Sequence, residues 1–223
     1  MPLIIPAINA SDFKTVSERI FTARTFLPPE GWIHIDVVDG RFAMNVTWND
    51  SEEFGDFLRT HITLRKLNFE IHLMIKEPEK AAEPWLNAGA RRLIVHEEAI
   101  VDPDLIVKQC ADYAAEAMLA AKPDTPVEEY FEYAKQFKEF QVLAVAPGWA
   151  GQEFKPETLK KISSLRERLT NATIEVDGGM NPVLVKKCRE AGADYFVAAS
   201  YIFGSTTPMK AYQELVSAAE GSG

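Results

Sequence analysis

Two histidines and two aspartates lie in apolar runs of the chain, where polar side chains need a physical explanation. His34 and Asp36 stand two residues apart in Trp-Ile-His-Ile-Asp-Val-Val-Asp-Gly, residues 32–40. In a strand, residues i and i+2 face the same side, so these two side chains project together. An unpaired carboxylate is costly to bury, which indicates that a cation compensates the charge of Asp36.

Two further residues of the same kinds lie in similar runs. His72 lies in Ile-His-Leu-Met and Asp177 in Ile-Glu-Val-Asp-Gly-Gly. Two imidazoles and two carboxylates suit a divalent transition metal such as Zn, Fe(II), Mn or Co. The four residues come from three separate segments, so a site exists only if the fold gathers those segments. The alternative is that each histidine is a core residue with satisfied hydrogen bonds. His96 ends another apolar run and is expected to be a hydrogen-bonded residue at the mouth of the fold.

Eight apolar, β-branched runs alternate with helical patterns along the chain. The predicted strands are residues 3–9, 32–39, 67–75, 92–98, 117–122, 141–146, 173–177 and 195–200, and the predicted helices are residues 12–26, 51–62, 78–88, 103–114, 127–137, 156–169, 182–191 and 208–219. Several helices open with proline, and Gly89 and Gly192 stand where a helix C-cap needs left-handed geometry.

This alternation over 223 residues predicts an α/β fold, a (β/α)8 TIM barrel, as a single domain over residues 1–223. An open doubly wound sheet is the alternative, although no Gly-x-Gly-x-x-Gly follows any predicted strand. In a barrel, catalytic groups gather at the carboxyl ends of the strands, which is where the polar residues described above fall.

Small residues follow the last three predicted strands. Glycines let the backbone approach an oxyanion, and loops at these positions of a TIM barrel often hold a phosphate. Tight turns without a ligand are the alternative. The candidate phosphate-binding residues are Gly148, Trp149, Ala150, Gly151, Gly178, Gly179, Ala199 and Ser200.

Composition narrows the classes of partner. A formal net charge of −9 argues against nucleic acid and anionic membranes as partners, because both require basic patches. The sequence has neither a secretory signal pattern nor an apolar run long enough to span a bilayer, so a cytoplasmic protein is expected. Cys110 and Cys188 lack metal-ligand spacing and are expected to be reduced thiols.

The ordered set of motifs resembles the ribulose-phosphate 3-epimerase family over nearly the whole chain. The residues that carry the resemblance are Pro6-Ala7-Ile8 with Asp12-Phe13, His34-Ile35-Asp36-Val37-Val38-Asp39-Gly40, Asn45-Val46-Thr47, His72-Leu73-Met74, Val95-His96-Glu97-Glu98-Ala99, Pro147-Gly148-Trp149-Ala150-Gly151-Gln152 and Glu175-Val176-Asp177-Gly178-Gly179. The family has a ribulose-phosphate-binding TIM barrel and interconverts D-ribulose 5-phosphate and D-xylulose 5-phosphate with a divalent metal.

The resemblance implies roles for particular residues. His34, Asp36, His72 and Asp177 would hold the metal, with Asp36 as the base and Asp177 as the acid when ribulose 5-phosphate is the substrate. The implied partner is a small-molecule sugar phosphate, and a homo-oligomer is expected. Residues expected to line the pocket are Ala7, Val38, Met74 and Leu143.

Substitutions at the mouth leave two alternatives open. Ala7 stands where a serine is usual in the family, Val38 and Leu143 stand where methionines are frequent, and Ala150 and Ala199 replace glycines. One alternative is a 3-epimerase for a hexulose 6-phosphate such as allulose 6-phosphate. The other is an inactive barrel that binds a sugar phosphate. Decarboxylases and synthases on related barrels are disfavoured because no lysine lies between Asp36 and Asp39.

Overall fold

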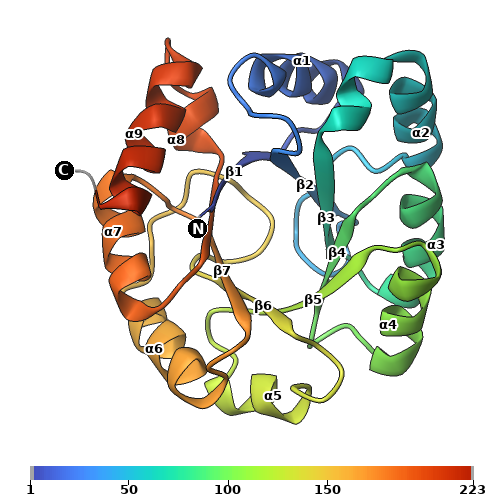
Figure 1. Ribbon diagram of the computed structural model, residues 1–223. Coiled ribbons are helices and arrows are strands. Elements are labelled where there is room, and N and C mark those ends of the chain that lie inside the picture. Colours follow the sequence, from blue (N-terminus) through green and yellow to red (C-terminus); the bar gives the residue numbers. More distant parts are fainter. Residues whose placement is uncertain (1–2, 222–223) are drawn as a thin grey trace.

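The strands form one closed parallel barrel, as predicted from the alternating pattern. The computed structural model describes residues 3–221. Each strand pairs with the next, and the last returns to the first (Figure 1). The strands are β1 (Leu3–Ile8), β2 (Trp32–Val38), β3 (Asn68–Met74), β4 (Arg92–His96), β5 (Glu116–Ala121), β6 (Glu139–Leu143), β7 (Thr173–Asp177) and β8 (Tyr195–Ala198).

Helices surround this barrel on the outside (Figure 1). They are α1 (Phe13–Arg24), α2 (Ser51–Thr60), α3 (Pro78–Ala88), α4 (Pro103–Asp112), α5 (Val127–Glu132), α6 (Thr158–Arg168), α7 (Pro182–Ala191), α8 (Ser200–Phe203) and α9 (Pro208–Glu220), with a 3₁₀ helix, η1, at Ile62–Lys66. No helix within residues 3–221 combines the length and apolar character that crossing a bilayer requires.

Local signals in the sequence explain where several helices begin and end. Asp12 and Asn181 each accept a hydrogen bond from the backbone amide three residues ahead, which satisfies a free donor of the first turn. Gly89 and Gly192 end α3 and α7 in the left-handed region, with φ of 117° and 111°. The predicted C-caps are thus confirmed, and they return the chain to β4 and β8.

The strands present two chemically different faces. Residues such as Ile33, Ile35 and Val37 point outward and belong to the main hydrophobic cluster beneath the helices. The alternate residues point into the barrel, where β2 places His34 and Asp36. Polar side chains also fill the interior from four other strands: Glu70, His72, Arg92, His96, Gln141, Glu175 and Asp177.

Most elements begin or end within one or two residues of the predicted boundaries, and three differences change the path of the chain. The helix predicted over residues 127–137 ends at Glu132, and turns closed by backbone bonds from the amides of Ala134 and Gln136 continue the chain. The strand predicted at 141–146 instead runs from Glu139 to Leu143, in register with Thr173–Asp177. Ser200 begins the short helix α8 rather than ending β8. For β6, pairing with β7, which a local pattern does not contain, sets the boundary.

Both cysteines are buried in helices and unpaired. Cys110 in α4 and Cys188 in α7 are 1% and 0% exposed, and the structure records each as a free thiol. Burial raises the pKa of each thiol to about 12, so neither forms a reactive thiolate at neutral pH. The expectation of ordinary reduced thiols fits this environment.

Candidate active site

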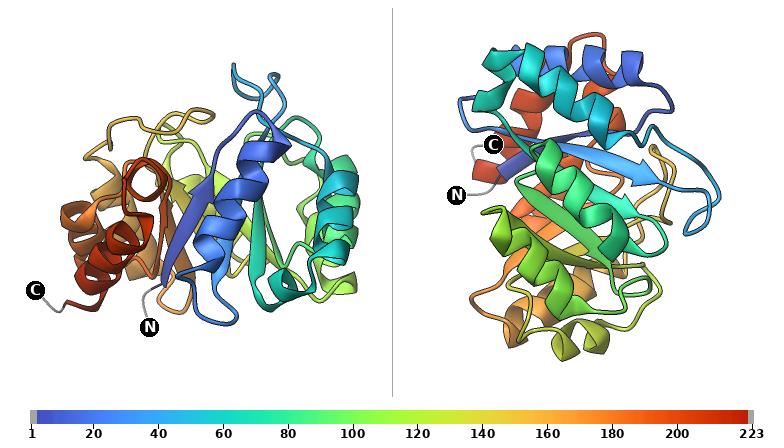
Figure 2. Two further views of the ribbon diagram at one scale, coloured as in Figure 1. Left: turned by 90° about the horizontal axis from the view of Figure 1, so that it is seen from above. Right: turned by 90° about the vertical axis from the view of Figure 1, so that its right-hand side faces the viewer.

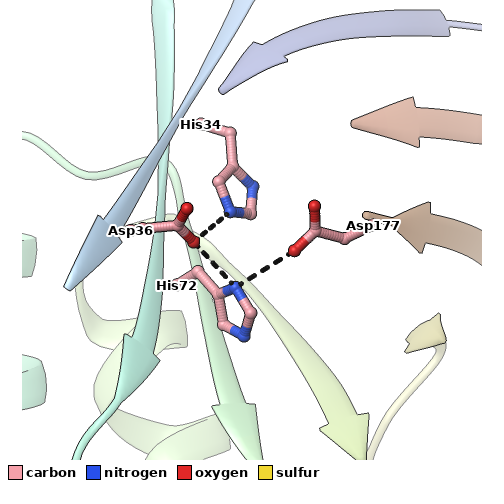
Figure 3. A group of neighbouring side chains, drawn as sticks. All are labelled: His34, Asp36, His72 and Asp177. Carbon is pink, nitrogen blue, oxygen red and sulfur yellow. Dashed lines mark hydrogen bonds and ion pairs between the residues drawn. The ribbon is translucent and has the colours of Figure 1, made fainter. Parts of the chain in front are cut away.

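The structure brings the four predicted metal ligands together inside the barrel. His34 and Asp36 come from β2, His72 from β3 and Asp177 from β7. One oxygen of Asp36, Oδ1, lies 3.2 Å from both His34 Nε2 and His72 Nδ1. Asp177 faces them from the other side, with Oδ2 3.6 Å from His72 Nδ1 (Figure 3).

This group has the chemistry and the spacing that a divalent cation needs. The four ligand atoms all lie within 4.8 Å of one another. Zinc ligands at about 2.0–2.2 Å in a tetrahedron would lie roughly 3.4 Å apart, close to the 3.2 and 3.6 Å observed. His72 Nδ1 is buried and has no hydrogen-bond partner, although two carboxylates lie beside it. A bound cation would satisfy this nitrogen and both carboxylates.

Burial and mutual charge shift the pKa values of the group in opposite directions. Burial lowers the pKa of His72 to about 4, only partly opposed by Asp36, so this imidazole is neutral at pH 7. Burial raises the pKa of Asp177 to about 7, opposed by His34 and reinforced by the charge of Asp36. Burial also acts to raise the pKa of Asp36, but its interactions with His34 and His72 outweigh that effect and lower the pKa. The two carboxyl groups therefore have different proton affinities.

A carboxylate and an arginine lie directly behind His34. His34 Nδ1 lies 2.7 Å from Glu70 Oε1, and Arg92 Nη1 lies 2.6 Å from Glu70 Oε2. Burial lowers the pKa of His34, but the hydrogen bonds to Asp36 and Glu70 outweigh it and leave the pKa well above its usual value. A carboxylate on the second nitrogen of a ligating histidine fixes which nitrogen faces the metal. Glu70 thus directs Nε2 of His34 toward the site.

A second group of side chains in the barrel, His34, Glu70 and Glu175, has a positive charge beside it without a metal, because Arg92 supplies it. His34, Glu70 and Glu175 are close enough to share an ion. The guanidinium of Arg92 already provides a positive charge there, 2.6 Å from Glu70 and 3.9 Å from Glu175. The interior therefore holds one ionic group around Arg92 and a separate candidate metal site above it.

The predicted phosphate-binding residues share one cavity with the two aspartates. Asp36 and Asp177 line its floor beside Met74 and Leu143. Ala7 and Val38 lie outside its lining: Ala7 packs on Ile5 and Val197 beneath the site, and Val38 belongs to a separate cluster with Phe42. Loops after β6, β7 and β8 supply the rest of the wall, including Gly148, Trp149, Ala150, Gly151, Gly178, Gly179, Ala199 and Ser200.

Glycines in these loops adopt conformations that other residues rarely adopt. Gly148, Gly151, Gly178 and Gly179 all have positive φ, between 69° and 114°. Ala199 has a φ of −101°, which suits any residue. The alanine at this family glycine position therefore fits the backbone.

Two asparagines contact the loop after β6, and one of them also contacts Asp36. Asn9 Nδ2 donates to Asp36 Oδ2 at 3.0 Å and to the carbonyl of Gly148 at 2.8 Å. Asn45 Nδ2 donates to the same carbonyl at 3.0 Å. The loops after β1, β2 and β6 thus meet at one carbonyl, at the end of the barrel from which the loop after β2 projects (Figure 2).

We expect Gly148→Ala to weaken sugar-phosphate binding and to lower the free energy of unfolding. A Cβ at this position would lie 2.1 Å from Asn45 Oδ1, and its φ of 114° is strained for alanine. The strain alone amounts to about 1–3 kcal/mol, and the clash would displace Asn45. Urea unfolding and the KM for the sugar phosphate would report the two effects.

Gly151→Ala is the matched control for this variant. Gly151 also has positive φ, 79°, but a Cβ there meets only Ser200 Cβ at 4.0 Å. It should show the backbone strain without the displacement of Asn45. Equal KM values for the two variants would contradict a role for the Asn45 contact.

Several functional residues were not identified from the sequence. Glu70, Arg92 and Glu175 stand at even spacing from His72, His96 and Asp177 on their strands, so the same i, i+2 rule marks them as inward-facing. The two-residue spacing could therefore have placed these three side chains inside the barrel. Asn9 carried no comparable signal, because its contact with Gly148 joins segments 139 residues apart.

Solved structures with a similar fold include phosphate-sugar enzymes. One is a structure of KGPDC from Streptococcus mutans, with a TM-score of 0.76 and 15% identity, covering 99% of this chain and 98% of that one. Another is 3-hexulose-6-phosphate synthase from Salmonella typhimurium, with a TM-score of 0.72 and 12% identity over all of both chains. At these identities the likeness shows the TIM-barrel fold alone.

Sequence relatives give a closer match. Ribulose-phosphate 3-epimerase from Mycobacterium tuberculosis is 32% identical over 219 residues, covering 96% of this chain and 91% of the relative. The protein of that name from Synechocystis is 36% identical over 211 residues, covering 91% and 88%. The model of the ribulose-phosphate 3 epimerase family matches residues 3–203. With its closed barrel and its two paired aspartates and histidines, the chain belongs to the ribulose-phosphate 3-epimerase family.

Proposed function

We propose that this protein inverts C3 of D-ribulose 5-phosphate to give D-xylulose 5-phosphate. The observation that carries the proposal is the pair of carboxyl groups, Asp36 and Asp177, that lie on two sides of one histidine nitrogen at the floor of the cavity. An epimerase needs one group to remove a proton and another to return it to the opposite face. A single mobile group would tend to return the proton where it came from.

Asp36 is assigned as the base in this direction and Asp177 as the acid. Despite its burial, Asp36 has a pKa that its interactions with His34 and His72 hold below its usual value, so it is ionised and can accept the C3 proton. Without a bound cation, burial raises the pKa of Asp177 to about 7. The two carboxyl groups therefore differ in proton affinity, as suits an acid and a base.

His34, Asp36, His72 and Asp177 would hold a divalent cation, with Zn, Fe(II), Mn and Co all compatible with this ligand set. When bound, the cation supplies the positive charge that stabilises negative charge developing on the substrate oxygens. That stabilisation matters because a carboxylate of ordinary pKa about 4 is a weak base toward a proton next to a ketone.

The phosphate group of the substrate would occupy the loops after β6, β7 and β8. These loops line the same cavity as the two aspartates, and their glycines leave the backbone amides accessible to an anion. A sugar phosphate bound there would place its carbon chain toward Asp36 and Asp177. We also propose a cytoplasmic location and a homo-oligomer, as expected from the sequence and the family resemblance.

Turnover of two ketose phosphates by metal-loaded protein tests this proposal. We expect D-ribulose 5-phosphate to be converted with a kcat/KM at least about tenfold above that for D-allulose 6-phosphate, a difference of about 1.4 kcal/mol. Chelator treatment should abolish turnover, and Mn, Co, Zn or Fe(II) should restore it. A preference for the hexulose phosphate would move the assignment to that substrate, and binding without turnover would identify an inactive barrel.

A further inference from the structure

A third buried histidine lies directly behind the metal-site histidine of β3. His96 Nε2, from β4, is 2.9 Å from His72 Nε2, and the two rings are within 17° of coplanar. Both side chains are fully buried. One hydrogen must lie between the two nitrogens, so one imidazole donates and the other accepts. The direction of this hydrogen bond determines which nitrogen of His72 carries a lone pair.

Glu98 sets that direction from the far side of His96. Its Oε2 lies 3.2 Å from His96 Nδ1. Its Oε1 accepts hydrogen bonds from the Lys122 amide at 2.8 Å and from the Thr125 hydroxyl. Burial raises the pKa of Glu98, but the contacts with His96, Thr125 and Lys122 outweigh it and lower the pKa to about 2. Glu98 is therefore an ionised carboxylate that can only accept.

Because Glu98 can only accept, it determines the direction of the hydrogen bonds that join Glu98, His96 and His72. His96 Nδ1 must donate to Glu98, which leaves a lone pair on His96 Nε2. His72 Nε2 must then donate to His96, which leaves the lone pair of His72 on Nδ1. His72 Nδ1 is the buried atom without a hydrogen-bond partner between Asp36 and Asp177.

We propose that Glu98 and His96 are positioning residues that fix the tautomer of His72, so that Nδ1 presents its lone pair to a bound cation. The inference rests on the proposed metal site. It also explains why each of the two histidines of the site has its own hydrogen-bond acceptor on the nitrogen that faces away from the site. His34 faces the site through Nε2, with Glu70 on Nδ1, whereas His72 faces it through Nδ1 and needs its acceptor on Nε2.

Glu98→Gln tests this series of hydrogen bonds, because it should reverse the direction in which each bond is donated. The Lys122 amide and the Thr125 hydroxyl require an acceptor, so the amide oxygen of Gln would stay on them and the amide nitrogen would face His96. His96 Nδ1 would then accept, and His96 Nε2 would donate toward His72. That arrangement conflicts with metal ligation through His72 Nδ1. We expect the affinity for Co²⁺ to fall about 10–100-fold, measured by competition with a chelator.

Two further variants separate this role from a structural one. Glu97→Gln makes the same chemical change one residue earlier. Glu97 takes no part in the hydrogen bonds that join Glu98, His96 and His72, so Co²⁺ affinity should be unchanged. His96→Gln keeps an acceptor for His72, because its amide can rotate without help from Glu98. In the His96→Gln background, Glu98→Gln should therefore lower Co²⁺ affinity by less than about threefold, as expected for residues that act as one unit.

A measurement on the wild type covers the case in which Glu98→Gln fails to fold. Long-range ¹H–¹⁵N spectra of Zn²⁺-loaded protein with labelled histidine should show His96 protonated on Nδ1 alone. A proton on His96 Nε2, or equal Co²⁺ affinity for Glu98→Gln and wild type, would overturn the inference while leaving the metal site in place. A wild type that gives no Co²⁺ absorption spectrum would instead refute the metal site, and the inference with it.

Discussion

Replacing Asp36 or Asp177, the proposed base and acid, with asparagine should lower kcat by about 10²–10⁴-fold, the usual contribution of a positioned acid or base. Asparagine preserves the size of the side chain and an oxygen for the metal, but it can neither accept nor return a proton. Asp36→Asn should have the larger effect, because Asp36 Oδ1 also lies 3.2 Å from both histidines and its negative charge helps to hold the cation. Steady-state turnover of ribulose 5-phosphate, with metal content measured on the same samples, gives both values.

The two variants should differ in how they exchange hydrogen with solvent. In D₂O, metal-loaded Asp177→Asn retains the base on one face and should incorporate deuterium at C3 of ribulose 5-phosphate without forming xylulose 5-phosphate. Asp36→Asn should leave C3 of ribulose 5-phosphate unlabelled. Asp112→Asn, an exposed residue at the end of α4, is the control and should match the wild type. Normal turnover by metal-loaded Asp177→Asn would contradict the assignment of Asp177 as the acid.

Arg92→Met should lower the free energy of unfolding by about 3–5 kcal/mol, the range for removing one partner of a buried ion pair. Arg92 is 1% exposed and lies between the rings of Trp32 and Tyr195, 4.2 and 5.4 Å from their centres. Its guanidinium lies 2.6 Å from Glu70 and 3.9 Å from Glu175, both fully buried. Methionine fills similar space but leaves Glu70 without a cation on one side. Urea unfolding measures the difference.

Two comparisons show whether charge causes this loss. Arg91→Met changes an exposed neighbour and should alter stability by less than about 0.5 kcal/mol. Glu175→Gln should be mild, because burial and the charge of Glu70 raise the pKa of Glu175 well above its usual value and so favour its neutral form. If Arg91→Met and Arg92→Met destabilised the protein equally, the buried ion network would not be the cause.

The barrel and the grouping of the four candidate metal ligands could be predicted from sequence because both depend on local periodicity. The two-residue spacing of His34 and Asp36 placed both side chains on the inner face of β2, and the repeated strand and helix pattern implied closure. His72 and Asp177 followed from their places on β3 and β7. The structure also confirms that His96 is hydrogen-bonded, and it shows in addition that His96 is fully buried.

The support around these ligands could not be predicted in the same way. The partner of His72 on its far side is His96, on the neighbouring strand, and the distance between two nitrogens depends on strand register and ring rotation. The placement of Ala7 and Val38 outside the cavity lining depends on how neighbouring side chains pack over them. The shared contact of Asn9 and Asn45 with Gly148 depends on three loops meeting in space.

The most direct test of the two-carboxylate mechanism is a brief incubation of wild-type, metal-loaded protein with D-ribulose 5-phosphate in D₂O. We predict that the xylulose 5-phosphate formed carries deuterium at C3, while the remaining ribulose 5-phosphate carries almost none at early times. That pattern requires one group to remove the proton and a second, exchanged with solvent, to return one to the opposite face. Product that retains the original hydrogen at C3, or no product at all, would contradict the mechanism.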